Sequence, residues 1–194
     1  MRRGCAAWLR QPLDYIRLDG VRASIELMLG DITTVGMDAV VNAANSQLAG
    51  GGGVDGAIHR AAGPELLAEC RTLGGCATGS AKITRGYRLK ARAVIHAVGP
   101  VWQGGTADEE GLLAGCYRSA LDLAAAHRLT SIAYPAISTG IYRFPADLAA
   151  RIAVGTVASE LAAAPRGLTL VTFCCFSPDS AEHHSNAFAE LGLV

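Results

Sequence analysis

A run of four consecutive glycines, Gly50 to Gly53, constrains the fold of this chain more than any other feature. The apolar residues 39–41 before it have the length and composition of a buried strand, and residues 54–62 after it follow a helical pattern. Backbone N–H groups without side chains, next to the free donors of a helix start, suit an anion, most often phosphate. The sequence therefore predicts a strand, a phosphate-binding loop and a helix. A glycine loop that binds nothing is the alternative.

The loop differs from the two best-known phosphate motifs. No Lys-Ser/Thr pair follows the glycines, so the loop is not the P-loop of Mg-nucleotide enzymes. Gly51-x-Gly53-x-x-Gly56 matches the dinucleotide fingerprint only as a string, and a NAD-dependent oxidoreductase needs such glycines directly after a first strand. It also needs an acidic residue about 20 positions further on. The nearest fit, residues 76–78, supplies none, which disfavours this class of enzyme.

Two polar side chains flank the glycines. Asn45 and Asp55 could serve as a turn residue and a helix N-cap, which are common roles for these residue types. A carboxamide, a phosphate cradle and a carboxylate within eleven residues nevertheless indicate a single site.

Two further segments follow predicted strands. Ser138-Thr139-Gly140, after the strand expected at 131–136, offers hydroxyls and backbone N–H groups for a second phosphate, or forms an ordinary connection. Asp31, after the strand expected at 23–29, is placed for a base or ribose contact, or for a turn. Ligands of α/β proteins bind where strands end, so we expect these segments to meet.

Strand and helix patterns alternate along the chain, which predicts an α/β protein: a three-layer α/β/α sandwich around a mixed, mostly parallel sheet. We expect strands at 82–87, 92–98 and 168–176 and helices at 64–73, 108–129, 145–164 and 178–191. At 194 residues the chain is expected to form one domain, residues 21–194. Residues 1–20 form an extension, either a tail or an extra strand. Asp19-Gly20 is a turn signal that leaves a hairpin open.

Composition limits the possible partners. Lys+Arg and Asp+Glu are both 17, so no basic surface is expected and nucleic acid is an unlikely partner. The six cysteines show no CxxC pairing and are interpreted as small buried residues, without a metal site or a disulfide framework. No apolar run approaches ~20 residues, so no membrane span is expected. We expect a cytoplasmic monomer without a cofactor or metal.

Ordered motifs along residues 23–190 resemble the macrodomain family in its MacroD-type branch. The Asn42-Ala-Ala-Asn45 segment and the Val54-Asp55-Gly-x-Ile-His59 helix start carry the resemblance. Gly30-Asp31-Ile32-Thr33 precedes them; the later motifs are Cys70-Arg-x-x-Gly-Gly-Cys76-x-Thr-Gly79, Val94-Ile-His96-x-Val-Gly-Pro-Val-Trp102 and Pro135-Ala-Ile-Ser138-Thr-Gly-Ile-Tyr142.

The resemblance implies a hydrolase that removes mono-ADP-ribose from Asp or Glu side chains of proteins and deacetylates O-acetyl-ADP-ribose. Asn45 and Asp55 would be the catalytic residues, positioning or activating a water, while the proton goes to Asp55 or to a substrate phosphate. The implied substrate-binding residues are Asp31 (to the adenine amino group), Ile32, Asn42, Gly50, Gly51, Gly52, Gly53, Val54, His59, Ser138, Thr139, Gly140, Ile141, Tyr142 (beside the distal ribose) and Phe176 (stacked on the adenine or proximal ribose).

Several roles stay open at this level. Phe176 fits the core as well as a site, His96 is expected to pack in the core rather than to serve a site, and His59 either orients the site or packs. Arg143 replaces the glycine that usually follows the matching tyrosine in the family; it would strengthen anion binding, stiffen the loop or simply face solvent. The alternative function is a module that recognises ADP-ribose without hydrolysing it. Under either function, nucleic acid is expected as a partner only if it is ADP-ribosylated.

Overall fold

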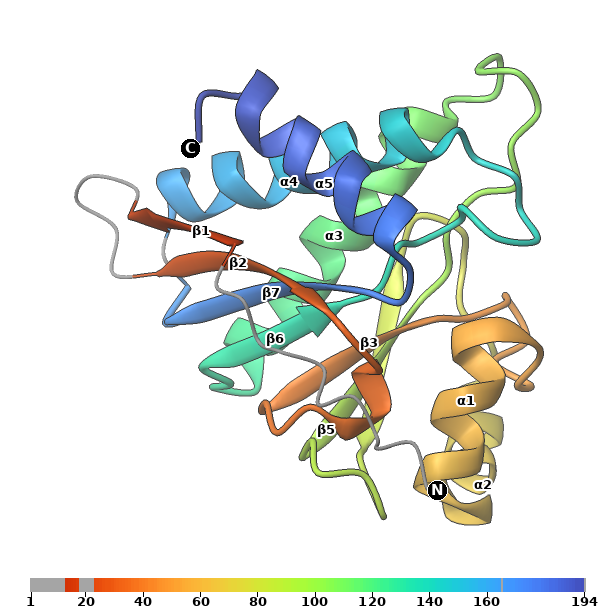
Figure 1. Cartoon of the computed structure of the whole chain (residues 1–194). Coiled ribbons are helices and arrows are strands. Elements are labelled where there is room, and N and C mark those ends of the chain that lie inside the picture. The colour runs from red at the N-terminus through yellow and green to blue at the C-terminus, as the bar shows by residue number, and fades with distance from the viewer. Residues whose placement is uncertain (1–12, 18–22, 165, 194) are drawn as a thin grey trace, which may run out of the picture.

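The structure is a computed structural model that describes residues 13–17, 23–164 and 166–193. Its centre is a seven-stranded sheet in the order β1-β2-β7-β6-β3-β5-β4 (Figure 1). The strands are β1 (Leu13–Arg17), β2 (Ser24–Leu29), β3 (Ala39–Ala43), β4 (Ala81–Arg85), β5 (Ala93–Ala97), β6 (Ser131–Tyr134) and β7 (Leu170–Cys175). The five inner strands pair in parallel and both outer strands pair antiparallel.

Helices cover both faces of the sheet. One face packs against α3 (Glu109–Ala126), α4 (Ala146–Ala163) and α5 (Pro178–Glu190). The other packs against η1 (Ile32–Thr34), α1 (Gly53–Ala62) and α2 (Pro64–Thr72). Parallel strands buried on both faces need apolar residues almost throughout, as in β5, where all five residues are buried. The predicted three-layer sandwich with a mixed, mostly parallel sheet is confirmed.

Residues of the predicted extension contribute to the sheet. β1 pairs with β2 through Ile16↔Ile25 and Arg17↔Ser24, so this part of the extension is an extra strand. The Asp19-Gly20 turn signal lies outside the described residues.

Most predicted boundaries lie within one or two residues of the observed ones, and two of the differences have local steric reasons. The strand expected to reach residue 87 ends at Arg85, because a turn begins at Gly86, where a Cβ would lie 1.8 Å from the Ala91 carbonyl oxygen. The helix expected from residue 108 begins at Glu109, because Asp108 takes a left-handed conformation with φ of 56°. The side chains of Cys174 and Cys175 face opposite layers, Cys175 toward the α3–α5 side and Cys174 toward the α1–α2 side.

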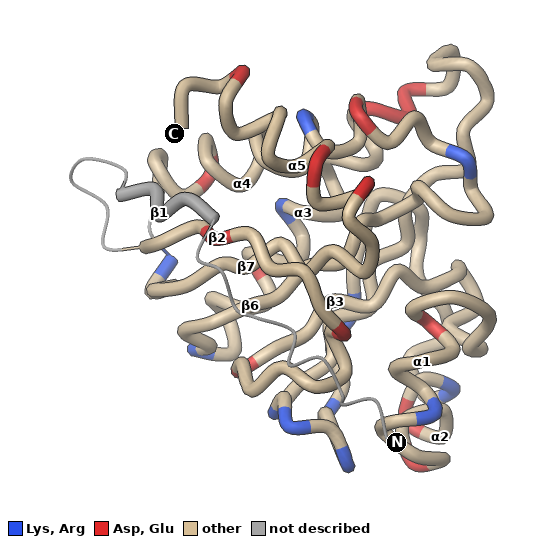
Figure 2. Tube along the Cα trace, in the orientation of Figure 1, with Lys and Arg blue, Asp and Glu red and all other residues tan. Residues whose placement is uncertain are grey.

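The carboxyl ends of the parallel strands carry the predicted site segments. Gly30 and Asp31 follow β2, the glycine loop follows β3, residues 135–145 follow β6 and Phe176 follows β7. The β4–β5 turn lies at the opposite end of the sheet, because β5 runs parallel to the inner strands and begins there. Figure 2 shows several blue Lys and Arg segments along the lower edge of the molecule. Among the described helices none is long and apolar enough to cross a membrane.

Candidate functional site

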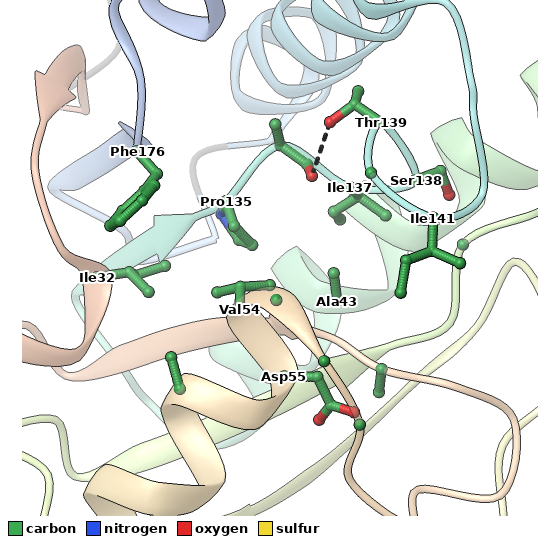
Figure 3. A pocket seen from close by; sticks show the side chains of 18 of the residues that line it. Ile32, Ala43, Val54, Asp55, Pro135, Ile137, Ser138, Thr139, Ile141 and Phe176 are labelled. Atoms are coloured by element: carbon green, nitrogen blue, oxygen red, sulfur yellow. Dashed lines mark hydrogen bonds between the residues drawn. The ribbon is translucent and has the colours of Figure 1, made fainter.

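A cleft of about 750 Å³ lies along the carboxyl ends of the strands. Phe176 and Ile32 face each other at one end, Asp55 lies at another, and residues 137–141 form the far wall (Figure 3). The cleft is lined by Gly30, Asp31, Ile32, Ala43, Ala44, Asn45, Gly51, Gly52, Gly53, Val54, Asp55, Ala57, Arg60, Gly99, Pro135, Ala136, Ile137, Ser138, Thr139, Gly140, Ile141, Tyr142, Cys174, Phe176, Ser177 and Ser180.

Both predicted phosphate loops line this cleft with free backbone donors. The N–H groups of Gly51, Gly52 and Gly53 donate to no other described residue, and neither do those of residues 138–142. Consecutive free N–H groups from two loops form a concave anion site. The loops approach each other, because a Cβ on Gly52 would lie 3.8 Å from Ile141 Cδ1. Two opposed rows of free N–H groups suit the oxygens of a diphosphate, and no lysine is among the described residues that line the cleft.

The second loop depends on a glycine that precedes it by about forty positions. Ser138 is buried with φ of 65°, and its Oγ has no partner among the described residues. A Cβ on Gly99 would lie 2.1 Å from that Oγ, so only glycine allows the loop to sit against β5. On the outer side of this loop, the backbone N–H of Trp102 donates to the Tyr142 carbonyl at 2.9 Å, and the Trp102 ring packs on Phe144.

A buried carboxylate outside the cleft fixes the loop that follows Trp102. Glu109 is buried and accepts backbone N–H groups from Gln103, Gly105 and Ala107 at 2.6 to 3.1 Å. Although burial opposes it, these hydrogen bonds keep the pKa of Glu109 below its ordinary value. A fixed carboxylate thus braces the segment that supports Tyr142.

One end of the cleft suits a planar base. Phe176 is 85% exposed in this structure, so it is a cleft residue and not a core residue. Asp31 Oδ1 caps η1 by accepting from the Thr33 N–H at 2.9 Å and the Thr33 hydroxyl at 2.8 Å. Its Oδ2 has no partner among the described residues, so Asp31 can act as a turn residue and as an acceptor for a base at once.

Asp55 lies at the opposite end of the cleft, with only 5% of its surface exposed. Asn42 Nδ2 donates to Asp55 Oδ1 at 2.7 Å, and His59 Nε2 lies 3.4 Å from the same oxygen. Burial raises the pKa of the Asp55 carboxyl, while the Asn42 hydrogen bond and His59 oppose that shift. The second oxygen, Oδ2, lies 3.1 Å from where a Cβ on Gly51 would stand, on the cleft side.

The other predicted catalytic residue is held by its own loop. Asn45 Nδ2 donates to the Gly50 carbonyl at 2.8 Å, and Asn45 Oδ1 accepts from the Ala49 N–H at 3.3 Å. Asn45 nevertheless lines the cleft, with Nδ2 3.7 Å from the Cβ position of Gly51. It shapes the glycine loop and borders the same space as Asp55.

Three of the predicted substrate-binding residues stand behind the cleft wall. Asn42 is fully buried and contacts Asp55, Gly50 packs on the His59 ring, and His59 contacts Asp55; none of them lines the cleft. Arg143 also does not line it; its side chain is exposed and its φ is 56°.

The sequence reasoning missed Arg60, the only basic residue among those that line the cleft. Its Nη1 lies 3.0 Å from the Cβ position of Gly56, which itself stands 2.4 Å from the Gly51 carbonyl oxygen. Arg60 is four positions after Gly56, so helical spacing places it on the glycine-loop side of α1 and was the available signal. The glycine at 56 is needed because any side chain would collide with the loop.

Behind Asp55 lies a buried group of nitrogen and sulfur atoms from His59, Cys70 and His96, all within 4.8 Å of one another. Both His96 nitrogens already have hydrogen-bonding neighbours: Asn42 at 3.1 Å and Thr84 at 2.9 Å. Burial lowers the pKa of His96 to about 3 and raises that of Cys70 to about 11. Because both ring nitrogens of His96 already have hydrogen-bonding neighbours, we interpret these residues as a buried hydrogen-bonded network. His96 packs in the core, as expected.

Comparisons with known proteins agree with this geometry. The family model of the Macro domain matches residues 41–153. A macro domain-containing protein of Mesorhizobium japonicum is 58% identical over 167 residues, 86% of this chain and 94% of the relative. An O-acetyl-ADP-ribose deacetylase of an Enterobacter species is 49% identical over 178 residues, 90% of this chain and 98% of the relative. The ADP-ribose glycohydrolase MACROD2 of Mus musculus is 55% identical over 155 residues, covering 78% of this chain but 32% of that longer protein.

Solved structures show the same fold with related ligands. The Oceanobacillus iheyensis macrodomain with ADP superposes with a TM-score of 0.84 at 41% identity, covering 88% of this chain and 92% of that one. The Trypanosoma brucei macrodomain in complex with ADP-ribose gives 0.79 at 45% identity, covering 84% and 68%. The family model spans more than half of the chain, and near-full-length relatives exceed 40% identity. The chain therefore belongs to the macrodomain family.

Proposed function

We propose that this protein hydrolyses the ester that joins ADP-ribose to Asp or Glu side chains of proteins and removes the acetyl group of O-acetyl-ADP-ribose. One observation carries the proposal: a buried carboxylate, Asp55, directs a free oxygen into the cleft beside Gly51 and Asn45. A site that only holds ADP-ribose has no need for a carboxylate there, because burying its charge costs free energy and places it near a ligand that is itself an anion.

The rest of the cleft fits ADP-ribose from end to end. The adenine would stack on Phe176 and donate its amino group to Asp31 Oδ2. The diphosphate would take the free N–H groups of the two loops, with Arg60 at the edge of the glycine loop. The distal ribose then reaches the space between Tyr142, Asn45 and Asp55.

The reaction adds water across the ester. The water oxygen joins one side of the broken bond and a proton joins the other, which gives free ADP-ribose and a free carboxylic acid. Asp55 is placed to accept a proton from that water as general base, or to hold the water while a substrate phosphate accepts the proton. A carboxylate is a good leaving group, so positioning of the water and of the ribose is the main task of the site.

Replacement of Asp55 by alanine tests the proposal. Asp55→Ala should reduce the release of ADP-ribose from a protein carrying glutamate-linked mono-ADP-ribose by about 10²-fold or more and leave ADP-ribose binding nearly unchanged. Turnover and calorimetric binding are measured together, with Glu110→Ala as a control that removes an exposed carboxylate from α3. Loss of binding and turnover together would assign Asp55 a ligand-holding role. No release by the unmodified protein, with ADP-ribose still bound, would instead identify a reader of ADP-ribose.

A further inference from the structure

A continuous row of buried polar side chains runs from Asp55 into the sheet. The parallel register of β3 and β5 makes Asn42 and His96 direct neighbours, and both side chains are fully buried. Thr84 on β4 follows, with its Oγ1 2.9 Å from His96 Nε2. Asn42 Nδ2 reaches both His96 Nδ1, at 3.1 Å, and Asp55 Oδ1, at 2.7 Å. The row therefore connects Thr84 to the carboxylate through two side chains.

The hydrogen bonds of the row have one consistent direction. The Thr84 hydroxyl donates its hydrogen to the Arg85 carbonyl at 3.2 Å, so toward His96 it acts as an acceptor. His96 is neutral and carries one N–H, which Thr84 places on Nε2. Nδ1 is then a lone pair, and it accepts one N–H of Asn42. The other N–H of Asn42 is directed at Asp55.

The alternative orientation of Asn42 would oppose the carboxylate. Rotation of the amide by half a turn would exchange Nδ2 and Oδ1, placing an oxygen where the nitrogen now stands 2.7 Å from Asp55 Oδ1. That arrangement requires a proton on Asp55 and a proton on His96 Nδ1. Asn42 Oδ1 is buried without a partner among the described residues, so the oxygen does not help to fix the orientation of the amide. Its two N–H bonds must fix it.

We propose that Thr84 and His96 are positioning residues that lock the Asn42 amide with an N–H toward Asp55, so that the Asp55 carboxylate is held ready to accept a proton. The inference rests on the function proposed for Asp55. Neither Thr84 nor His96 lines the cleft, and both act through Asn42.

Other groups that face Asp55 are few. His59 comes from its own helix α1, Cys70 from α2 and His96 from β5. Burial keeps the Cys70 thiol protonated, and it lies 3.6 Å from His96 Nε2. Sulfur is a weak acceptor, so it does not replace the Thr84 hydroxyl as the group that orients the ring. His59 contacts Asp55 directly and is outside the row.

The decisive variant is Thr84→Val, which keeps the size and shape of the side chain and removes the acceptor. The ring is then free to carry its proton on Nδ1, which removes the acceptor for Asn42. The pKa of Asp55 should rise by about one unit, the size expected for loss of a hydrogen bond to a charged group. It is measured by ¹³C NMR titration of the side-chain carboxyl without any substrate, and the signal is assigned with Asp55→Asn.

Controls separate this effect from loss of packing. Thr172→Val removes another buried hydroxyl, which donates to Glu26 in the other half of the strand order from β3 and β5, the strands next to Asp55. This variant should leave the pKa of Asp55 unchanged. His96→Asn keeps an acceptor near the Nδ1 position, whereas His96→Leu removes it. In His96→Asn, Asp55 should titrate at nearly the same pH as in the unmodified protein. In His96→Leu, it should titrate at a higher pH. The shift caused by Thr84→Val should persist in a His59→Gln background.

The results decide between this role and simple packing. An unchanged Asp55 titration in Thr84→Val, or equal shifts in His96→Asn and His96→Leu, overturns the proposal. The acid limb of kcat/KM should move with the NMR value, whereas a packing defect would lower activity at every pH. If the unmodified protein releases no ADP-ribose, the proposed hydrolysis fails, while the substrate-free titration still decides the role of the row.

Discussion

A methyl group at Gly51 would test the space in which the reaction is proposed to occur. A Cβ there would lie 3.1 Å from Asp55 Oδ2 and 3.7 Å from Asn45 Nδ2, and so would stand between the two predicted catalytic residues. Its volume is about that of one water molecule, ~30 Å³. Gly51 has no left-handed φ, so alanine causes no backbone strain. Gly51→Ala should therefore exclude the attacking water and leave the fold intact.

The expected loss follows from the role of that water. Without the water, the carboxylate of Asp55 has nothing to activate, so the loss should equal that for removal of an aligned general base. That loss is about 10²-fold or more in kcat, which is about 3 kcal/mol of transition-state stabilisation. Release of ADP-ribose from a glutamate-modified protein is compared with calorimetric binding of ADP-ribose. Gly52→Ala is the matched control, because its Cβ would make only an ordinary contact, 3.8 Å from Ile141 Cδ1. If Gly51→Ala turns over like Gly52→Ala, the water does not lie between Asp55 and Asn45, and the reasoning fails.

Two further predictions concern the ends of the cleft. Phe176→Ala should weaken ADP-ribose binding by roughly 5- to 150-fold through lost stacking. The unfolding temperature should not change, because the ring is 85% exposed. An unchanged affinity in calorimetry would mean that the adenine does not stack on Phe176. Asp55→Asn should raise the unfolding temperature at neutral pH by a few degrees. The raised pKa means that the folded protein binds the Asp55 proton more tightly than the unfolded chain, so wild-type stability falls as the pH rises from 3.8 through the folded pKa. In thermal scans, the difference in unfolding temperature between Asp55→Asn and the wild type should increase over this pH range. A difference that does not depend on pH would contradict the argument that burial raises the pKa of Asp55.

The fold could be predicted because local patterns and global architecture agree. The central strands β3 and β5 are short, mainly apolar runs, β2 alternates apolar and polar residues, and the long helix α3 has an apolar face. The ends were less predictable, since they depend on single residues: Gly86 closes the turn after β4, and Asp108 takes a left-handed conformation before α3. Whether the start of the chain formed a strand depended on pairing with β2, which no local pattern specifies.

Most residues that line the cleft could be predicted from the sequence, but not which of the predicted residues would lie behind its wall. Loop composition and the family resemblance placed Asp55, Asn45 and Phe176 at one cleft. The sequence does not contain the register that puts Asn42 beside His96, so a residue expected at the ligand stands behind the wall. Arg60 was missed because an arginine on a helix is usually solvated, and only the close contact of Gly56 with Gly51 brings it to the cleft edge.

The proposed diphosphate site consists of backbone dipoles, with Arg60 the only cation among the residues that line the cleft. Dipoles fixed in a concave loop act over a few ångströms, whereas a cluster of lysines attracts any polyanion over a Debye length of about 10 Å. With a formal net charge of zero, the protein has little long-range attraction for RNA, DNA or free polyphosphates. The proposed site should therefore resist competition from such polyanions and favour a ligand whose shape brings its phosphates into contact with both loops.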